Sequence, residues 1–382
     1  MRVLLVHNAY GRPSGEEAVV AATHDLLADH GHAVASFIRE SSTIETMPIG
    51  RLRAFAAGIY SLAARREFRR SVQEFRPDLV HLHNLYPLIS PAVIDEARAL
   101  GVPIVMTLHN YRILCPNGRL SSRGEICHRC VTGQEFWCIW RNCEENLPKS
   151  IGYACRNAVA RWRRTFDQVD RFVALTGFQR DLLATRLPAE RIRVIGNPVT
   201  IPSAPPSSGA TSYVGFVGRL SPEKGVALLF DAARRCPSLE FRFAGETARM
   251  AAEVAAAPPN CRFLGQLAAA RLPEFYAGAR LLVLPSTWHE VLPLSLLEAM
   301  AHGKAVLCAD VGALPEVLED GRCGFLFRRG DADDLTARLH QLWGRSEDLA
   351  AVGARARARI IASYAPAVLY GELMALYQEL VP

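Results

Sequence analysis

The 382-residue sequence has no run of eighteen uninterrupted apolar residues and no low-complexity segment. The missing apolar run argues against a transmembrane helix, because crossing a bilayer takes about 20 predominantly apolar residues. The apolar part of the first ten residues, MRVLLVHNAY, is too short for a secretory signal, and no small-residue cleavage site follows it. We therefore expect a cytoplasmic protein, in which the ten cysteines are thiols or metal ligands and not a disulfide framework.

Several ligand-binding motifs are also missing. No G-x-G-x-x-G follows the first apolar segment, which disfavours a nicotinamide-dependent dehydrogenase. The Walker pattern G-x-x-x-x-G-K-[ST] is absent, and no Asp-x-Asp triad ends a predicted strand, so a catalytic Mg²⁺ is not expected. No recognised nucleic-acid-binding module is present, so nucleic acid is not expected as a partner.

The composition is typical of a globular chain with two domains. Half of the residues are apolar and 21% are charged, and the length exceeds that of one ordinary domain. The net charge of +6 and the pI near 8.8 suit anionic ligands, nucleic acid or an acidic membrane surface, and they select none of these.

Short apolar runs alternate with longer helical patterns along the chain. In the first half, the predicted strands are 2–7, 32–38, 78–84, 102–110, 171–176 and 191–197, and the predicted helices are 15–31, 51–75, 90–101, 151–167 and 177–187. In the second half, the predicted strands are 213–218, 239–245, 261–265, 280–286, 304–310 and 323–327, and the predicted helices are 224–235, 247–257, 270–278, 293–302, 314–319, 331–343, 346–363 and 366–380. Continuous apolar strands that alternate with helices are typical of a parallel sheet covered on both faces.

Residues 198–212 are rich in proline, serine and glycine and are the best linker candidate. We therefore expect an α/β fold of two Rossmann-like, doubly wound domains, 1–200 and 201–363, that face each other across a cleft. A cysteine-rich insertion occupies 111–150, and the last helix, within 364–382, could cross back to the first domain. Ligands of such sheets bind beyond the carboxyl ends of the strands, so the residues at those ends are the candidates for a site.

The loop GRLSPEKG, residues 218–225, follows a predicted strand of the second half. Gly218 allows a tight turn, and the cations of Arg219 and Lys224 suit a diphosphate. A surface loop with two solvated cations is the alternative.

The segment WHEVLPLSLLEAM, residues 288–300, carries Glu290 in a loop and Glu298 inside the helix that follows. Pro293 is predicted at the first helical position. The free amides near Leu294 and Ser295 favour an anion, and carboxylates accept hydrogen bonds from sugar hydroxyls. Two carboxylates around a phosphate-sized site match the hexose, diphosphate and ribose of a nucleotide sugar, whereas a solvated helix face is the alternative.

Together with the stretch TLHN, residues 107–110, these two segments resemble the retaining glycosyltransferases of family 4, which have the GT-B fold. The resemblance covers essentially the whole chain and implies a C-terminal domain that binds a nucleoside diphosphate sugar and an N-terminal domain that binds the acceptor. It implies transfer of a hexose to a glycan or lipid-linked acceptor in surface polysaccharide or glycolipid biosynthesis. The residues with implied roles are His109 in the active site, Glu290 at the hexose, Glu298 at the ribose, and Arg219 and Lys224 at the diphosphate.

On the acceptor side, residues 8–20 correspond to the glycine-containing loop of that family, in which Ser14-Gly15 replaces the usual pair of glycines. Gly15 alone keeps the close backbone approach that a missing Cβ permits. His83 is a candidate for lining the acceptor site, although a histidine at the end of a strand is as often a packed residue. The resemblance does not identify the sugar, because Pro293 stands where many members have glycine.

Six of the ten cysteines lie between residues 115 and 155. Cys127 and Cys130 have the spacing of metal ligands, and Cys115 and Cys143 flank them. Four thiolates could hold a structural Zn²⁺ in tetrahedral geometry. Reduced cysteines packed as small hydrophobes are the alternative.

The stretches 51–76 and 156–166 are cationic and amphipathic. Such helices can lie on anionic lipid, so a peripheral position on the inner face of the cell membrane is expected, with a solvated basic face as the alternative. Two other functions stay open. One is a nucleotide-sugar epimerase or a phosphorylase of GT-B fold, although no lysine site for pyridoxal phosphate is identifiable. The other is a non-catalytic protein that binds sugar nucleotides or glycans.

Overall fold

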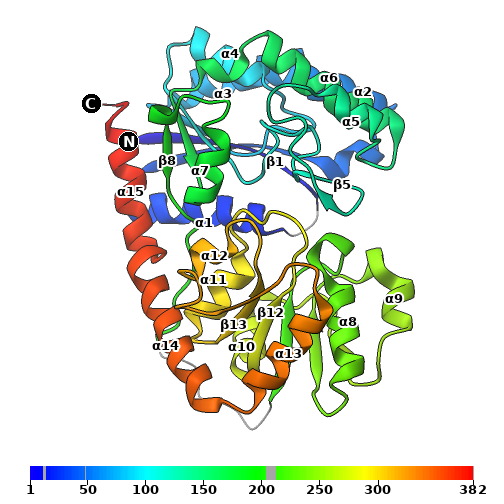
Figure 1. Cartoon of the computed structure of the whole chain (residues 1–382). Helices are drawn as coiled ribbons and strands as arrows, with labels where there is room; N and C mark the ends of the chain where they lie inside the picture. Colours follow the sequence, from blue (N-terminus) through cyan, green and yellow to red (C-terminus); the bar gives the residue numbers. More distant parts are fainter. Residues whose placement is uncertain (12–13, 48, 204–211, 382) are drawn as a thin grey trace. The chain divides into compact units, whose positions relative to one another are not determined.

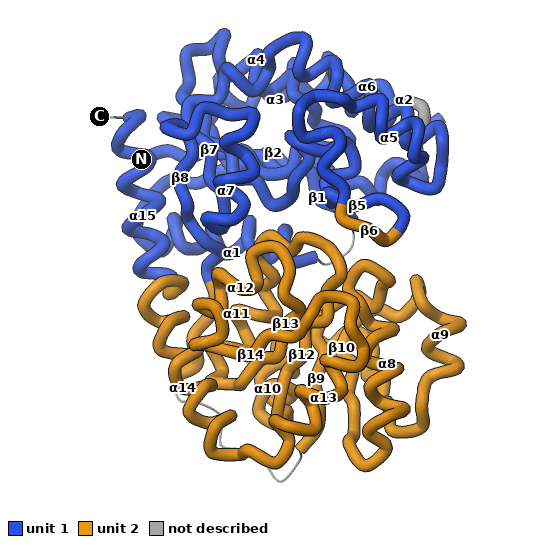
Figure 2. Tube along the Cα trace, viewed as in Figure 1, with its two compact units in different colours: residues 1–123, 127–198, 366–382 blue, residues 124–126, 199–365 orange. Residues whose placement is uncertain are grey.

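A computed structural model describes residues 1–11, 14–47, 49–203 and 212–381 (Figure 1). The chain divides into two compact units (Figure 2). Unit 1 comprises residues 1–123, 127–198 and 366–382, and unit 2 comprises residues 124–126 and 199–365. Of the linker candidate 198–212, residues 204–211 lie outside the described residues.

Unit 1 is built on a six-stranded parallel sheet in the order β2-β1-β3-β4-β7-β8. Its strands are β1 (Arg2–Ala9), β2 (Ala33–Glu40), β3 (Leu79–Leu82), β4 (Ile104–Thr107), β7 (Arg171–Ala174) and β8 (Ile192–Val194). Every residue of β3 and β4 is buried, as expected for central strands with helices on both faces. Val3 of β1 pairs with Val34 on one side and Leu79 on the other.

The helices of unit 1 are α1 (Gly15–Asp29), α2 (Gly50–Ile59), α3 (Leu62–Phe75), α4 (Ala92–Ala99), α6 (Leu147–Trp162), α7 (Gly177–Leu183) and α15 (Pro366–Gln378), with the 3₁₀ turns η1 (Ser41–Glu45), η2 (Thr165–Gln168) and η3 (Ala189–Arg191). The insertion contains β5 (Ser121–Ser122), β6 (Glu125–Ile126) and α5 (Phe136–Trp140). The single helix predicted at 51–75 is two helices, because Tyr60 is extended and the hydroxyl of Ser61 caps α3 by accepting from the amide of Ala64.

The last helix, α15, packs into the core of unit 1. Leu369, Leu373, Leu376 and Tyr377 join a buried cluster that includes Val3. Their spacing places them on one helix face. By length and composition alone the stretch 346–378 could cross a membrane. The burial of these α15 side chains gives its apolar residues a packing role within the unit.

Unit 2 has a second six-stranded parallel sheet, in the order β11-β10-β9-β12-β13-β14. Its strands are β9 (Tyr213–Val217), β10 (Phe241–Ala244), β11 (Cys261–Phe263), β12 (Ala279–Leu284), β13 (Val306–Ala309) and β14 (Phe325–Phe327). Its helices are α8 (Val226–Arg235), α9 (Ala251–Ala255), α10 (Leu272–Gly278), α11 (Leu294–Ala301), α12 (Leu314–Val317), α13 (Ala332–Trp343) and α14 (Ser346–Ser363), with the turns η4 (Pro222–Lys224), η5 (Ala248–Met250) and η6 (Ala269–Arg271).

The strand order reverses once in each sheet, between β1 and β3 in unit 1 and between β9 and β12 in unit 2. At such a switch point the connections leave in opposite directions and open a crevice at the carboxyl ends of the strands. The prediction of two doubly wound parallel sheets is confirmed, and the two switch points are where a ligand is expected.

Candidate active site

Two of the predicted site segments meet at the switch point of unit 2. The loop 218–225 leaves β9, and the loop 285–293 leaves the neighbouring strand β12. Gly225 has φ +70°, and a Cβ placed on it would lie 1.8 Å from the carbonyl oxygen of Pro285. Glycine at this position therefore permits the two loops to approach. The amide of Thr287 then donates to the carbonyl oxygen of Glu223 at 3.0 Å, which ties the loops together.

Lys224 and Glu290 form an ion pair across these loops. The Lys224 Nζ lies 2.7 Å from Glu290 Oε1, and the same oxygen accepts from Ser286 Oγ at 2.6 Å and from Trp288 Nε1 at 2.9 Å. Burial works to raise the pKa of Glu290, but Lys224 and the two hydrogen bonds outweigh it and hold that pKa below its usual value. Glu290 is therefore a fixed carboxylate at neutral pH.

Arg219 lies at the start of the same loop and is exposed. Its guanidinium donates to Glu223 Oε1 at 3.1 Å. Burial works to raise the pKa of Glu223, but a backbone hydrogen bond and Arg219 together lower it. Both cations of the loop are thus paired with glutamates in this structure.

The helix α11 starts one residue later than the sequence suggests. Pro293 is the N-cap, with an extended backbone at φ −67° and ψ 126°, and Leu294 is the first helical residue. In the described part of the chain, no acceptor is recorded for the amides of Leu294 and Ser295. They are the orphan donors that a helix start offers to an anion.

Glu298 lies one turn into α11. Its Oε2 accepts from the hydroxyl of Tyr276 in α10 at 2.6 Å. Burial raises the pKa of Glu298, and the hydroxyl only partly offsets this. The sequence predicts Glu290 and Glu298 but not their partners. Ser286 and Trp288 are near Glu290 in the chain, which is a weak signal, whereas nothing in the sequence points to Tyr276.

Four histidines gather at the switch point of unit 1. His83 Nδ1 lies 2.9 Å from His109 Nε2, and the two rings stack with centroids 5.2 Å apart. His81 stacks on His83 and bonds through its two ring nitrogens to Tyr377 of α15 and Thr107 of β4. His7, within β1, meets His83 edge to face.

Burial lowers the pKa of all four histidines: to about 4 for His7, to about 3 for His81 and His109, and well below its usual value for His83. Their imidazoles are therefore neutral at neutral pH. They can donate and accept hydrogen bonds there without adding charge.

A pocket in unit 1 is lined by His83, His109, Glu16 and Arg112, among others. Arg112 donates to Asn84 Oδ1 at 2.6 Å, and the hydroxyl of Tyr10 donates to Glu16 Oε2 at 3.0 Å. The Glu16 Oε1, Arg112 Nε and His83 Nε2 atoms are buried and have no partner among the described residues. Burial raises the pKa of Glu16 to about 7. The sequence prediction includes His83 and His109 but misses Glu16 and Arg112.

Gly15 is the first residue of α1, and Ser14 caps that helix by accepting from the amide of Glu17 at 3.4 Å. This position places Glu16 at the carboxyl end of β1, beside the pocket. The predicted close backbone approach at Gly15 stays a prediction.

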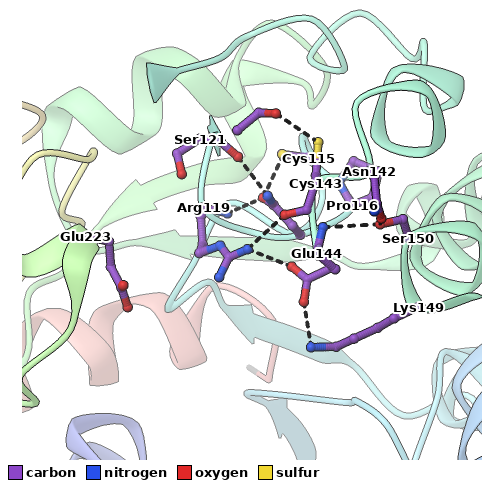
Figure 3. A network of polar contacts seen from close by, with 12 residues as sticks. Cys115, Pro116, Arg119, Ser121, Asn142, Cys143, Glu144, Lys149, Ser150 and Glu223 are labelled. Atoms are coloured by element: carbon purple, nitrogen blue, oxygen red, sulfur yellow. Dashed lines mark hydrogen bonds and ion pairs between the residues drawn. The ribbon is translucent and has the colours of Figure 1, made fainter. Parts of the chain in front are cut away.

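The cysteine insertion is held by hydrogen bonds of its own (Figure 3). Cys115 Sγ donates to Asn117 Oδ1 at 3.0 Å, and Cys143 Sγ donates to Ser122 Oγ at 3.4 Å. Cys130 packs with Cys138 in a small apolar cluster. The described residues contain no group of three or more His, Cys, Asp or Glu that could hold a metal ion. The zinc site of Cys115, Cys127, Cys130 and Cys143 therefore stays a prediction.

Comparison with known proteins places the chain in a family. Residues 201–359 match the glycosyl transferases group 1, and residues 14–198 match a glycosyl transferase 4-like domain. The chain is 30% identical to a phosphatidyl-myo-inositol mannosyltransferase of Mycobacterium tuberculosis over 82% of this chain and 79% of that protein. It is 24% identical to sulfoquinovosyl transferase SQD2 of Arabidopsis thaliana over 91% of this chain, but spans 64% of that protein's length.

Two solved structures show the same fold. HepE of Anabaena, in complex with UDP-glucose, has a TM-score of 0.70 at 19% identity and covers 99% of this chain and 100% of its own. Sucrose-phosphate synthase from Thermosynechococcus elongatus has a TM-score of 0.74 at 16% identity, with 99% and 98% covered. The chain therefore belongs to the group 1 glycosyl transferases, the retaining hexosyltransferases of GT-B fold that use nucleotide-sugar donors.

Proposed function

We propose that this chain transfers a hexose, with retention of configuration, from a nucleoside diphosphate sugar to a hydroxyl group of a glycan or lipid-linked acceptor, in surface polysaccharide or glycolipid biosynthesis. The observation that carries the donor assignment is the Lys224–Glu290 ion pair at the β9–β12 switch point. A lipid-linked acceptor is supported by one of the relatives, a phosphatidyl-myo-inositol mannosyltransferase.

The donor is held by charges of both signs. The ammonium of Lys224 has three N–H donors, so it can bond to Glu290 and to the diphosphate together. Arg219 and the amides of Leu294 and Ser295 supply further donors to the diphosphate. Such pre-placed donors typically contribute about 2.7–4 kcal/mol each to stabilising a leaving anion. These cations and amides stabilise the leaving diphosphate, so no step is routed through a catalytic metal.

The two glutamates hold the rings on either side. Glu290 is ionised, so it accepts hydrogen bonds from hexose hydroxyls and gives up no proton. Glu298 lies about one turn deeper on α11 and would accept from the ribose, with Tyr276 orienting its carboxyl group.

In the transfer step, the bond between the anomeric carbon and the diphosphate oxygen breaks, and a bond from that carbon to the acceptor oxygen forms on the same face. The proton of the acceptor hydroxyl passes to the leaving diphosphate oxygen. His109 is neutral and acts through hydrogen bonds to the transferred sugar, and Gly15 and His83 contribute to the acceptor side.

The test is a thermal-shift screen of the protein against a panel of nucleoside diphosphate sugars, followed by mass spectrometry of products on candidate glycolipids and glycans. We expect one donor class to raise the Tm of the wild type. The variants Lys224→Met and Glu290→Gln should lose that shift and the transfer. The matched control is Arg271→Met, which removes an exposed cation of unit 2 for which no ion pair is recorded among the described residues.

Equal donor-induced shifts in Lys224→Met and in the control would refute the donor assignment. Conversion of the donor to an epimer in the absence of any acceptor would show an epimerase. Donor binding without any transfer or conversion, across the whole acceptor panel, would favour a binding protein.

A further inference from the structure

Unit 1 carries a set of exposed apolar side chains on three helices. Trp140 at the end of α5 is 80% exposed, and Trp162 at the end of α6 is 83% exposed. The same helices and α2 expose further large side chains. We define the α2–α5–α6 surface by Phe55, Phe136, Trp140, Leu147, Ile151 and Trp162. A contiguous patch of exposed apolar side chains is typical of a surface that binds a protein or a membrane, whereas single exposed residues are normal.

The three helices pack side by side, because α2 and α5 each contact α6 (Figure 1). On α6, Leu147, Ile151 and Trp162 are separated by four and eleven residues and so share one helix face. Phe55 of α2 lies directly against Gly152, where an added Cβ would clash with its ring. The apolar side chains of α2 and α6 are therefore neighbours and not scattered single residues.

The start of α6 is fixed by a polar network (Figure 3). Glu144 accepts from Arg119 at 2.8 Å and pairs with Lys149 of α6 at 2.6 Å. Ser150 donates to Asn142 at 3.0 Å and accepts from the amide of Glu144 at 3.1 Å. These bonds hold the segment between α5 and α6 in place, so the two helices are fixed relative to each other and their exposed side chains are too.

The charge around this surface is positive. Residues 50–76 contain seven arginines and two glutamates, and residues 147–164 contain five basic residues and no acid, an excess of ten positive charges. Arg156 is buried and the exposed Glu145 lies beside the second segment, which leaves an excess of eight. The five acids elsewhere that pair with these segments reduce the excess to three. Those acids are Asp95, Glu96, Glu135, Glu144 and Asp167.

Some of these cations are not engaged. Arg53, Arg66 and Arg70 are exposed, and no ion pair with another described residue is recorded for them. Arg66 and Arg70 follow the exposed Leu62 at intervals of four residues, so α3 repeats the pattern of an apolar side chain beside cations on one face.

We propose that the α2–α5–α6 surface docks on an anionic lipid bilayer. Trp140, Trp162 and Phe136 insert at the level of the headgroups, where amphipathic aromatic rings are favoured, and the arginines face the lipid phosphates. Charge complementarity selects a bilayer with negative headgroups as the occupant, because a neutral partner would leave the positive excess without a counterpart. This docking does not rest on the transferase function.

The test is flotation of the full-length protein with vesicles of phosphatidylglycerol and phosphatidylcholine in equal parts, against vesicles of phosphatidylcholine alone, at low and high salt. We expect flotation with the anionic vesicles that weakens at high salt. The double substitution Trp140→Ser with Trp162→Ser should lower the partition coefficient by about a hundredfold, because each large apolar side chain is worth roughly tenfold or more. The matched control is Leu264→Ser with Ile361→Ser, two partly exposed apolar residues of unit 2.

The electrostatic part has its own pair of variants. Arg53→Glu in α2 should weaken binding to anionic vesicles by at least about fivefold, whereas Arg271→Glu in unit 2 should leave it within about twofold. Circular dichroism and the Tm should be unchanged in all these variants, since the side chains are exposed. Donor-induced thermal shifts are measured on the same proteins. A protein that shows the donor-induced shift but does not float refutes the docking and leaves the proposed transferase function standing.

Three outcomes would overturn the proposal. The first is equal flotation of the tryptophan variant and its control. The second is equal binding to neutral and anionic vesicles. The third is that the wild type binds no vesicles and is a dimer by light scattering, whereas the tryptophan variant is a monomer. That result would make the surface an interface between two copies of the chain.

Discussion

Replacing Lys224 by methionine tests whether the Lys224–Glu290 ion pair stabilises the fold as well as binding the donor. The side chain of Glu290 is only 7% exposed and that of Lys224 is 22% exposed. Exposed pairs contribute about 0–1 kcal/mol, and removing one partner of a fully buried pair costs about 3–5 kcal/mol. The Lys224–Glu290 pair is intermediate between these cases, and Ser286 and Trp288 still donate to the carboxylate in Lys224→Met. We therefore expect this variant to lose about 2–3 kcal/mol of its free energy of unfolding. The Tm of a domain of this size would fall by about 4–10 °C.

The pH dependence of this loss follows from the pKa of Glu290. In the wild type the folded-state pKa lies below the unfolded value, so the carboxylate contributes stability above about pH 4.3, and that stability is lost as the pH falls through the folded-state pKa. In Lys224→Met the ammonium no longer opposes the effect of burial, and the folded-state pKa rises. The difference in stability between the two proteins is therefore largest near neutral pH and narrows as the pH falls toward about 4.

Urea unfolding of wild type, Lys224→Met, Glu290→Gln and the double variant, each at neutral and acid pH, measures this directly. The double variant should be more stable than the sum of the two single losses implies, because it buries no unpaired charge. Additive losses, or a Lys224→Met loss that is the same at both pH values, would refute the reasoning.

Two further predictions follow from the remaining geometry. Because burial holds the pKa of His109 at about 3, the pH profile of kcat/KM should show no inflection near pH 6.5, and an inflection that disappears in His109→Gln would contradict this. Urea unfolding of three glycine-to-alanine variants should separate backbone strain at positive φ from the steric contact with Pro285. Gly371→Ala, at an open site, should be near neutral or stabilising, and Gly265→Ala, at an open site with φ +65°, should lower the free energy of unfolding by about 1 kcal/mol. Gly225→Ala, with φ +70° and the contact to Pro285, should be much more destabilising than either. Similar losses in Gly265→Ala and Gly225→Ala would show that the loop contact is not tight.

Most of the fold could be predicted because its strands are short buried apolar runs. The run predicted at 280–286 is β12 (Ala279–Leu284), and its two neighbours in the sheet, β9 and β13, are short apolar runs as well. The break between α2 and α3 escapes prediction because no proline marks it, and the one glycine beside it, Gly58, is tolerated inside a helical pattern. The late start of α11 at Leu294 has another cause: proline is frequent at the first helical position, but the extended ψ of 126° makes Pro293 the N-cap here.

The site could be predicted only where its chemistry lies in one segment. Glu290 and Glu298 are eight residues apart, and their spacing on a loop and a helix is visible in the chain. The contact between Glu290 and Lys224 spans 66 residues and depends on β9 and β12 being neighbours, which no local pattern reveals. In unit 1 the same is true of Glu16 and Arg112, because the start of α1 and the loop after β4 bring them to one pocket.

The pairing of the cations explains how a site can be positive enough for a diphosphate and still be stable when empty. Lys224 is neutralised by Glu290 and Arg219 by Glu223, so neither cation of the loop 218–225 is left without a counter-charge when no donor is bound. A diphosphate would compete for both cations. The exposed Arg219–Glu223 pair is weak and gives up its cation at small cost, whereas Lys224 keeps Glu290 and adds the phosphate with its remaining N–H groups. Arg219 therefore contributes mainly to affinity for the donor. Lys224 contacts both the leaving diphosphate and Glu290, the carboxylate that holds the hexose.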